Sequence, residues 1–225
     1  MVLKPPRTER LAIAGPAGAL QALVETPVTE HGEPLTVPAF AVVCHPHPLF
    51  GGTLDNKVVY TLARAFEQLG APAIRFNFRG VGTSEGAYDE GRGESDDALA
   101  MVAWGRRRWP DVPLWLAGFS FGGAVAARIA APAQPERVVL VAPGISRLER
   151  TDFDAARAAV PTCPWLIVQG DADDVVAPQA VLSWARELRP RPGVRAPAVS
   201  VLPGAGHFFH GRLHEVREAV LAFMA

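Results

Sequence analysis

The chain has 225 residues, of which 49% are hydrophobic and 20% are charged, and its formal net charge is −1. A chain of this size and composition can bury one large core, so we expect a single domain over residues 1–225, and the balanced charge argues against a nucleic-acid partner. No stretch is long and apolar enough to cross a bilayer, and the N-terminus has no signal-peptide core, so we predict a cytoplasmic protein without a membrane partner.

The first elements along the chain predict an antiparallel hairpin, because residues 8–14 and 20–26 are β-prone runs on either side of a Gly-Pro-Ala-Gly turn. Six near-continuous apolar runs follow, as strands buried on both faces require, at residues 40–44, 73–78, 114–117, 137–141, 165–168 and 198–202. Apolar residues at helical spacing occupy residues 56–69, 96–107, 121–131, 178–188 and 212–224. This alternation predicts an α/β fold: a mostly parallel eight-stranded sheet, entered through the hairpin, with helices on both faces.

A G-x-S-x-G sequence, Gly118-Phe119-Ser120-Phe121-Gly122, stands where an apolar run meets a helical pattern. A serine at such a junction occupies a sharp, strained turn, and glycines two residues before and after it remove side chains that would collide. The turn exposes the serine hydroxyl at the carboxyl edge of the sheet. Glycine is abundant in this chain, so the five residues alone could also form an ordinary loop. Other motifs in the sequence are needed to distinguish a catalytic turn from such a loop.

An acid and a histidine follow two later strands, in the order Ser120, Asp173, His207. The carboxyl ends of parallel strands meet at one edge of a sheet, so these three side chains are expected to lie together there. A neutral His207 would take the proton of the Ser120 hydroxyl, and Asp173 would orient the imidazole and stabilise its charged form. Asp171, two residues earlier, is the alternative acid.

These motifs resemble the α/β-hydrolase superfamily over nearly the whole chain. The order of serine, acid and histidine is that of the superfamily, and residues 170–178 and 206–207 are similar to its acid and histidine loops. The Arg-Gly-x-Gly-x-Ser segment at residues 79–84 resembles the turn after its fourth strand. The resemblance implies the α/β-hydrolase fold, and the short stretch at residues 144–162, where many relatives insert a lid, implies that no large lid is present.

Residues 45–52, His-Pro-His-Pro-Leu-Phe-Gly-Gly, resemble a small bacterial subgroup of lidless hydrolases that is distantly similar to dienelactone hydrolases. Common members have His-Gly where this chain has His45-Pro46, and proline has no N–H to donate to an oxyanion. The Phe121 N–H is the first expected donor, and we favour His47 as the second, with Leu49 as the alternative. The side chains expected to line the acyl pocket are those of Leu49, Phe50, Phe119 and Phe208.

Other interpretations of single motifs are weaker. His45 and His47 could be imagined as metal ligands, but no third histidine stands at a metal-like spacing, and we expect neither a metal nor another cofactor. A Gly-x-Gly at residues 80–82 hints at a dinucleotide loop, but its third glycine is replaced by Glu85. Cys44 and Cys163 lie in or beside apolar runs, which favours small buried hydrophobes in a reducing compartment over a disulfide.

The sequence therefore predicts a cofactor-free serine hydrolase. It would cleave an ester, thioester or related acyl bond of a small substrate through an acyl-serine intermediate. Two alternatives remain open: an acyltransferase with the same three residues, and a binding protein that keeps the fold with a vestigial site.

Overall fold

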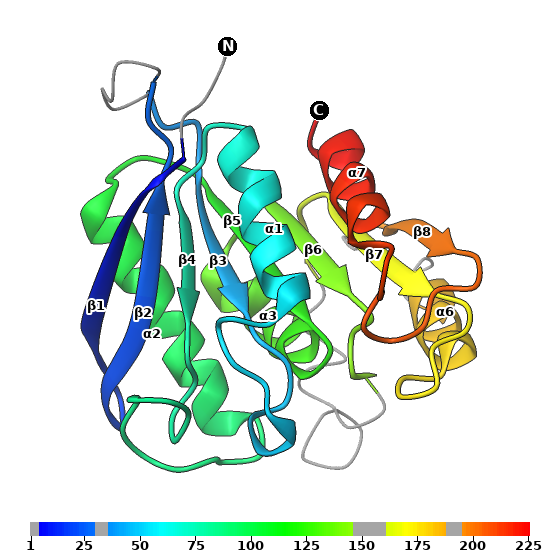
Figure 1. Cartoon of the computed structure of the whole chain (residues 1–225), viewed down its shortest axis with the longest axis horizontal. Coiled ribbons are helices and arrows are strands. Elements are labelled where there is room, and N and C mark those ends of the chain that lie inside the picture. The colour runs from blue at the N-terminus through cyan, green and yellow to red at the C-terminus, as the bar shows by residue number, and fades with distance from the viewer. Residues whose placement is uncertain (1–4, 30–35, 146–160, 188–194) are drawn as a thin grey trace.

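A twisted sheet of eight strands runs through the centre of the computed structural model, which describes residues 5–29, 36–145, 161–187 and 195–225 (Figure 1). The strand order is β1-β2-β4-β3-β5-β6-β7-β8. Antiparallel pairing joins β1 to β2 and β2 to β4, and every other neighbouring pair is parallel. The strands are β1 (Arg7–Gly15), β2 (Gly18–Thr26), β3 (Phe40–Cys44), β4 (Ala73–Phe76), β5 (Leu114–Phe119), β6 (Arg137–Val141), β7 (Trp165–Gly170) and β8 (Ala198–Leu202). The predicted mostly parallel sheet with an antiparallel hairpin is confirmed.

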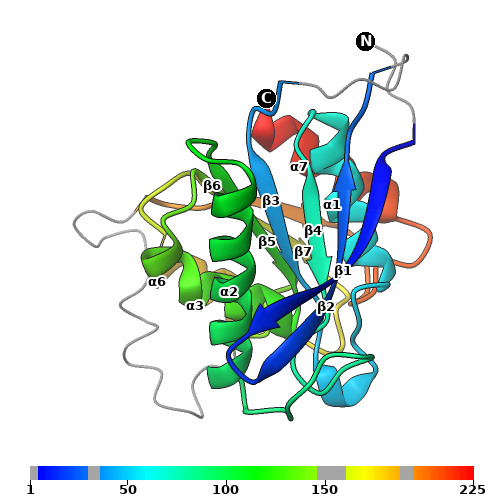
Figure 2. The ribbon, with the colours of Figure 1, turned by 90° about the vertical axis from the view of Figure 1, so that its left-hand side faces the viewer.

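Helices cover both faces of this sheet, as the two views in Figures 1 and 2 show. On one face, α1 (Lys57–Gln68) and α7 (Leu213–Met224) pack side by side over a core that includes Phe66 and Val220. The other face is covered by α2 (Arg92–Arg108), α3 (Phe121–Ala133) and α6 (Pro178–Glu187). The central strands are near-continuous apolar runs because both of their faces are covered.

The structure corrects the prediction for β8. Its sequence is apolar, but only Leu202 of its five residues is buried, because β8 is the last strand of the sheet and its outer side has no neighbouring strand. A second correction concerns α2, which begins at Arg92 rather than at residue 96. The buried Glu94 carboxylate accepts the N–H groups of Asp89 and Gly91, at 2.9 and 2.7 Å, and so fixes an earlier start.

The predicted absence of a large lid concerns residues 144–162, of which 146–160 lie outside the described residues. Within the four described ranges, no helix is long and apolar enough to cross a membrane. The carboxyl ends of the parallel strands lie toward the lower edge of the molecule in Figure 1, and loops from β3, β5, β7 and β8 gather there. The candidate site is built from these loops.

Candidate active site

Ser120 occupies a strained turn between β5 and α3, with φ 55° and ψ −119°. A positive φ is unfavourable for a residue with a side chain, and such strain is often found at functional sites. The close approach of strand and helix explains the flanking glycines, because a Cβ on Gly118 would lie 2.1 Å from Gly122 O, and one on Gly122 would lie 2.3 Å from Cys44 O. The Ser120 backbone N–H donates to Val141 O at 2.9 Å and holds the turn against β6.

The structure brings Ser120, His207 and Asp173 into one hydrogen-bonded chain. His207 Nε2 lies 3.0 Å from Ser120 Oγ, and His207 Nδ1 lies 2.8 Å from Asp173 Oδ2. All three side chains are buried or nearly so. With a proton on Nδ1, the imidazole donates to Asp173 and leaves Nε2 as an acceptor for the Ser120 hydroxyl, which is the arrangement that general-base activation of a serine requires.

The Asp173 carboxylate is held at both oxygens. Oδ1 accepts the backbone N–H groups of Val175 and Val176 at 2.9 and 2.8 Å, and Oδ2 accepts from His207 and from Gln169 Nε2, the latter at 3.1 Å. Burial by itself raises the pKa of the Asp173 carboxyl, but the hydrogen bonds from His207, Val176 and Val175 and the charge of His207 outweigh it and lower the pKa below its usual value. Asp173 is therefore ionised at neutral pH.

The alternative acid, Asp171, lies elsewhere. It is exposed, and its Oδ1 accepts the backbone N–H of Gly204 at 2.5 Å, so it joins the acid loop to the histidine loop from outside. The structure thus places Asp173, and not Asp171, against the His207 ring.

A cavity of about 390 Å³ opens beside Ser120. Of the four side chains expected in it, Phe50 and Phe208 line it. The other two lie elsewhere: Phe119 is fully buried and packs against the His207 ring, with centroids 4.9 Å apart, and the Leu49 side chain is 66% exposed outside the cavity. Lining residues that were not predicted from the sequence include Asn56, Gly144, Val175 and Val176. Of these, Val176 had a signal in the sequence, because it stands inside the acid-loop motif.

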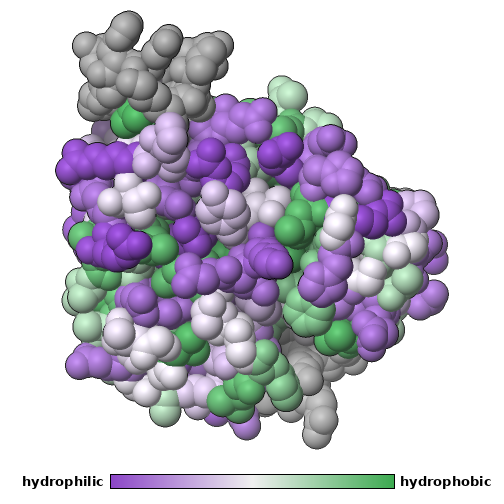
Figure 3. All heavy atoms as spheres, viewed as in Figure 1, coloured by the Kyte–Doolittle hydropathy of each residue, from purple (hydrophilic) through white to green (hydrophobic). Residues whose placement is uncertain are grey.

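The mouth of this cavity is apolar. Among the residues that line the cavity, Phe50, Val175 and Phe208 have large apolar side chains that are exposed to solvent. Figure 3 shows a largely hydrophilic face with an apolar patch toward its lower edge, the edge at which the strands of Figure 1 end. Hydrophobic side chains gathered at a pocket mouth are typical of ligand sites.

His47 lies at the wall of the cavity among three aromatic rings. Its centroid is 4.7 Å from that of Phe50 and 5.0 Å from those of Tyr88 and Phe121. Its Nδ1 accepts the Leu49 N–H at 3.2 Å, and its Nε2 lies 3.2 Å from Tyr88 Oη. The Leu49 N–H is therefore engaged within the loop, which weakens its candidacy as an oxyanion donor.

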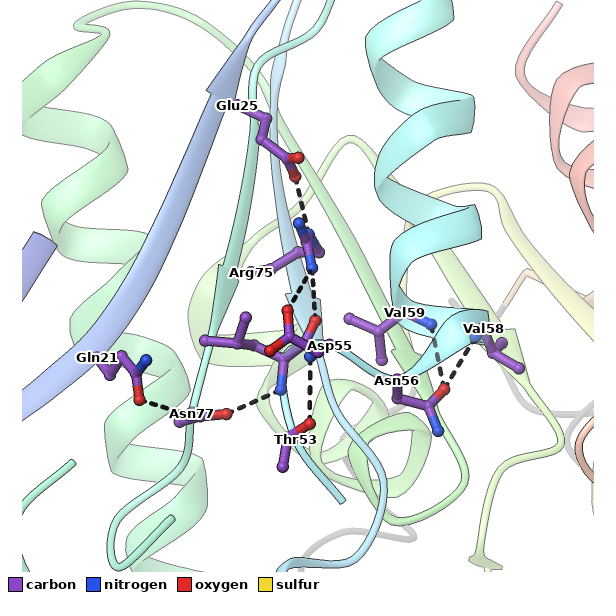
Figure 4. Close-up of polar contacts among 10 residues, drawn as sticks. Gln21, Glu25, Thr53, Asp55, Asn56, Val58, Val59, Arg75 and Asn77 are labelled. Carbon is purple, nitrogen blue, oxygen red and sulfur yellow. Dashed lines mark hydrogen bonds and ion pairs between the residues drawn. The ribbon is translucent and has the colours of Figure 1, made fainter. Parts of the chain in front are cut away.

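The loop that carries His47, residues 45–56, is anchored to β4 by a polar network that Figure 4 shows. Arg75 donates to Glu25 Oε2 at 2.8 Å and to Leu54 O at 2.7 Å. Asn77 Oδ1 accepts the Leu54 N–H at 2.8 Å, and Asn77 Nδ2 donates to Gln21 Oε1 at 2.8 Å. The N–H and the C=O of Leu54 are thus fixed by a side chain of β4 and by one directly after it, and these bonds hold the loop that forms one wall of the cavity.

His45 is a buried structural histidine. Its Nε2 accepts the Phe78 N–H at 3.0 Å, and its Nδ1 lies 2.6 Å from Pro46 O, to which it donates. Burial lowers the pKa of His45 to about 4. Both ring nitrogens are engaged by backbone groups, so His45 is not placed to share a metal ion with His47.

We expect this histidine to make the protein less stable in acid. The unfolded chain binds a proton at His45 near pH 6.5 and the folded chain only near pH 4, so the stabilisation is complete above pH 6.5 and is lost as the pH falls toward 4. The loss is about 3 kcal/mol across that window. Urea unfolding at pH 7 and pH 4.5 measures it, and His45→Gln should show a smaller pH dependence than the wild type. The matched control is His214→Gln at an exposed position, and equal pH dependence in all three proteins would contradict the assignment.

Two family models match the chain. One, described as alpha/beta hydrolase fold, matches residues 42–151, and the other, the prolyl oligopeptidase family, matches residues 145–225. Among curated proteins, the chain is 34% identical over 183 residues to an uncharacterized protein of Rickettsia prowazekii, covering 80% of this chain and 76% of that protein.

Similar solved structures indicate the same α/β-hydrolase class as the family models. XC6422 from Xanthomonas campestris, a member of the α/β serine hydrolases without a lid, is 40% identical, with a TM-score of 0.85 over 100% of this chain and 96% of that chain. An α/β serine hydrolase homologue from Coxiella burnetii is 39% identical, with a TM-score of 0.83 over 96% of this chain and 97% of that chain. The fold of the chain and its similarity to these proteins define its class as an α/β hydrolase. The chain belongs to the α/β serine hydrolase family, and the similarity to a lidless member agrees with the predicted absence of a large lid.

Proposed function

We propose that the protein is a carboxylesterase or thioesterase that cleaves the acyl bond of a small uncharged substrate, with Ser120 as nucleophile, His207 as base and Asp173 as the acid that orients it. The observation that carries the proposal is the hydrogen-bonded chain from Ser120 Oγ through His207 to Asp173 Oδ2 at the wall of an open cavity. A strained serine with a base in reach and an ionised acid behind that base has the three parts that acyl transfer to a hydroxyl needs.

In the proposed reaction, His207 Nε2 takes the hydroxyl proton while Ser120 Oγ attacks the substrate carbonyl. The tetrahedral intermediate collapses when His207 returns the proton to the departing alcohol or thiol, which leaves an acyl group on Ser120. Water then enters, His207 takes one of its protons, and the hydroxyl group adds to the acyl carbon. Collapse of this second intermediate returns a proton to Ser120 Oγ and releases the carboxylic acid.

The oxyanion formed in both steps is assigned to the backbone N–H groups of Phe121 and His47. Phe121 begins α3, where N–H groups have no acceptor within the helix, and Gly144 lies beside it without a side chain to cover it. Within the loop, the Leu49 N–H donates to His47 Nδ1 and the Phe50 N–H donates to His47 O at 3.1 Å. His47 itself lines the cavity, which supports its amide as the second donor.

The cavity favours an uncharged acyl group. Among the described residues that line it, none is an aspartate, glutamate, lysine or arginine, whereas Phe50, Phe121, Phe208, Val175 and Val176 supply apolar wall. A charged acyl group would lose its hydration there without gaining an ionic partner. Apolar and aromatic acyl groups gain from the same contacts.

A panel of p-nitrophenyl esters tests the proposal. Butyrate and phenylacetate esters should be hydrolysed, and the hemisuccinate ester, which matches butyrate in chain length but carries a carboxylate, should have a kcat/KM at least about tenfold lower. Acyl-CoA thioesters in the same panel separate thioesterase from esterase activity. Activity should persist in EDTA. Acyl transfer to an added alcohol in preference to water would establish the acyltransferase instead, and binding without turnover of any ester or thioester would contradict the proposed enzyme.

A further inference from the structure

Asp173 has a hydrogen-bond donor that the reaction above does not use. Gln169 is the fifth of the six residues of β7, and its side chain is completely buried. Its Nε2 lies 3.1 Å from Asp173 Oδ2 and 3.1 Å from Gly170 O, so the two protons of the amide have two acceptors. One of these acceptors is the same carboxylate oxygen that receives the His207 Nδ1–H.

The other end of this amide has no partner among the described residues. Gln169 Oε1 is buried without a hydrogen bond, a situation that disfavours the folded state and that native proteins seldom tolerate without a reason. The reversed amide orientation is excluded, because it would place Oε1 against Asp173 Oδ2, an acceptor against an acceptor. A methionine or leucine would fill the same space without an orphan carbonyl, so filling space does not explain a glutamine here.

We propose that Gln169 is a positioning residue for the active site, whose Nε2–H fixes the Asp173 carboxylate oxygen that meets the His207 ring; this inference rests on the proposed function. Val175 and Val176 hold only Oδ1. Without Gln169, Oδ2 would be held by His207 alone, so the carboxylate oxygen that orients the imidazole would lose its second donor.

The test compares Gln169→Met, which keeps the size and removes the donor, with Gln179→Met, a matched change at an exposed position of α6. Gln169→Met should lower kcat about tenfold with KM within about twofold, because a less firmly held carboxylate orients the His207 ring less well. Gln169→Glu should lose more activity, because a second carboxylate would stand against Asp173. Gln179→Met should match the wild type in all of these.

A residue that only fills space would behave otherwise. If Gln169→Met lowers the melting temperature while kcat and KM stay at the wild-type values, the positioning role is overturned. The readout can also be separated from turnover, because the rate at which a fluorophosphonate labels Ser120 should fall in Gln169→Met whether or not a substrate is known. An unchanged labelling rate overturns the inference, whereas a slower rate in a protein that hydrolyses no ester supports it and contradicts only the proposed function.

Discussion

Replacing Ser120 with alanine should abolish labelling by a fluorophosphonate and lower kcat for ester hydrolysis by on the order of 10⁶. Only a serine paired with a base is activated, and Ser120 is 3.0 Å from His207 Nε2. Alanine leaves the backbone turn in place and removes only the attacking oxygen. Mass spectrometry of the labelled protein gives the modified residue, and Ser183→Ala, an exposed serine on α6, is the control that should label normally.

Label on Ser84, Ser146 or Ser183 in place of Ser120 would contradict the assignment. A structure of the labelled protein tests the oxyanion site in the same experiment, because the phosphonyl oxygen should lie about 2.7 to 3.1 Å from Phe121 N and His47 N. An oxygen that touches neither amide would remove the loop at residues 45–56 from the mechanism.

Asp173→Asn should lower kcat by about 10⁴ while the protein remains folded. The Val175 and Val176 N–H groups will keep the asparagine oxygen on their side, so its NH₂ must face His207 Nδ1 and Gln169 Nε2. A donor then faces the imidazole, which must carry its proton on Nε2 and cannot accept one from Ser120. Steady-state kinetics and circular dichroism measure the two quantities.

Asp171→Asn is the matched control for that change. It removes the same charge two residues away, and we expect kcat within about twofold of the wild type, because Asp171 contacts Gly204 and not the His207 ring. A large loss in Asp171→Asn with near-normal turnover in Asp173→Asn would transfer the role to Asp171.

The parts of this protein that local sequence determines were predicted from the sequence. The glycines on either side of Ser120 predict a close crossing of strand and helix. In the structure, a Cβ added to Gly118 or Gly122 would lie 2.1 to 2.3 Å from a backbone oxygen. The eight strands and their mostly parallel pairing follow from the alternation of apolar runs and helical patterns. The order of Ser120, Asp173 and His207 along the chain, combined with the rule that parallel strands end at one edge, predicted which side chains would meet.

Contacts between elements distant in sequence could not be predicted in this way. Phe119 stands beside Ser120, yet a strand that is apolar on both faces gives no signal for which face each side chain takes, and its ring packs under His207 instead of in the cavity. Tyr88, which lies 3.2 Å from His47 Nε2, belongs to a connection without a motif. The exposure of β8 depends on its place at the edge of the sheet, which its own five residues do not specify.

The N-terminal hairpin helps to hold the loop at residues 45–56, which lines the cavity beside Ser120. Glu25 on β2 orients Arg75, and Gln21 on the same strand orients Asn77 (Figure 4). Arg75 in turn donates to the Leu54 carbonyl, and Asn77 accepts the Leu54 N–H. A shortened protein that begins after this hairpin would retain every residue of the proposed chemistry but lose the two side chains that orient Arg75 and Asn77 behind the loop at residues 45–56. Any effort to miniaturise the protein, or to fuse a partner to its amino end, must therefore leave β2 and its pairing with β4 intact.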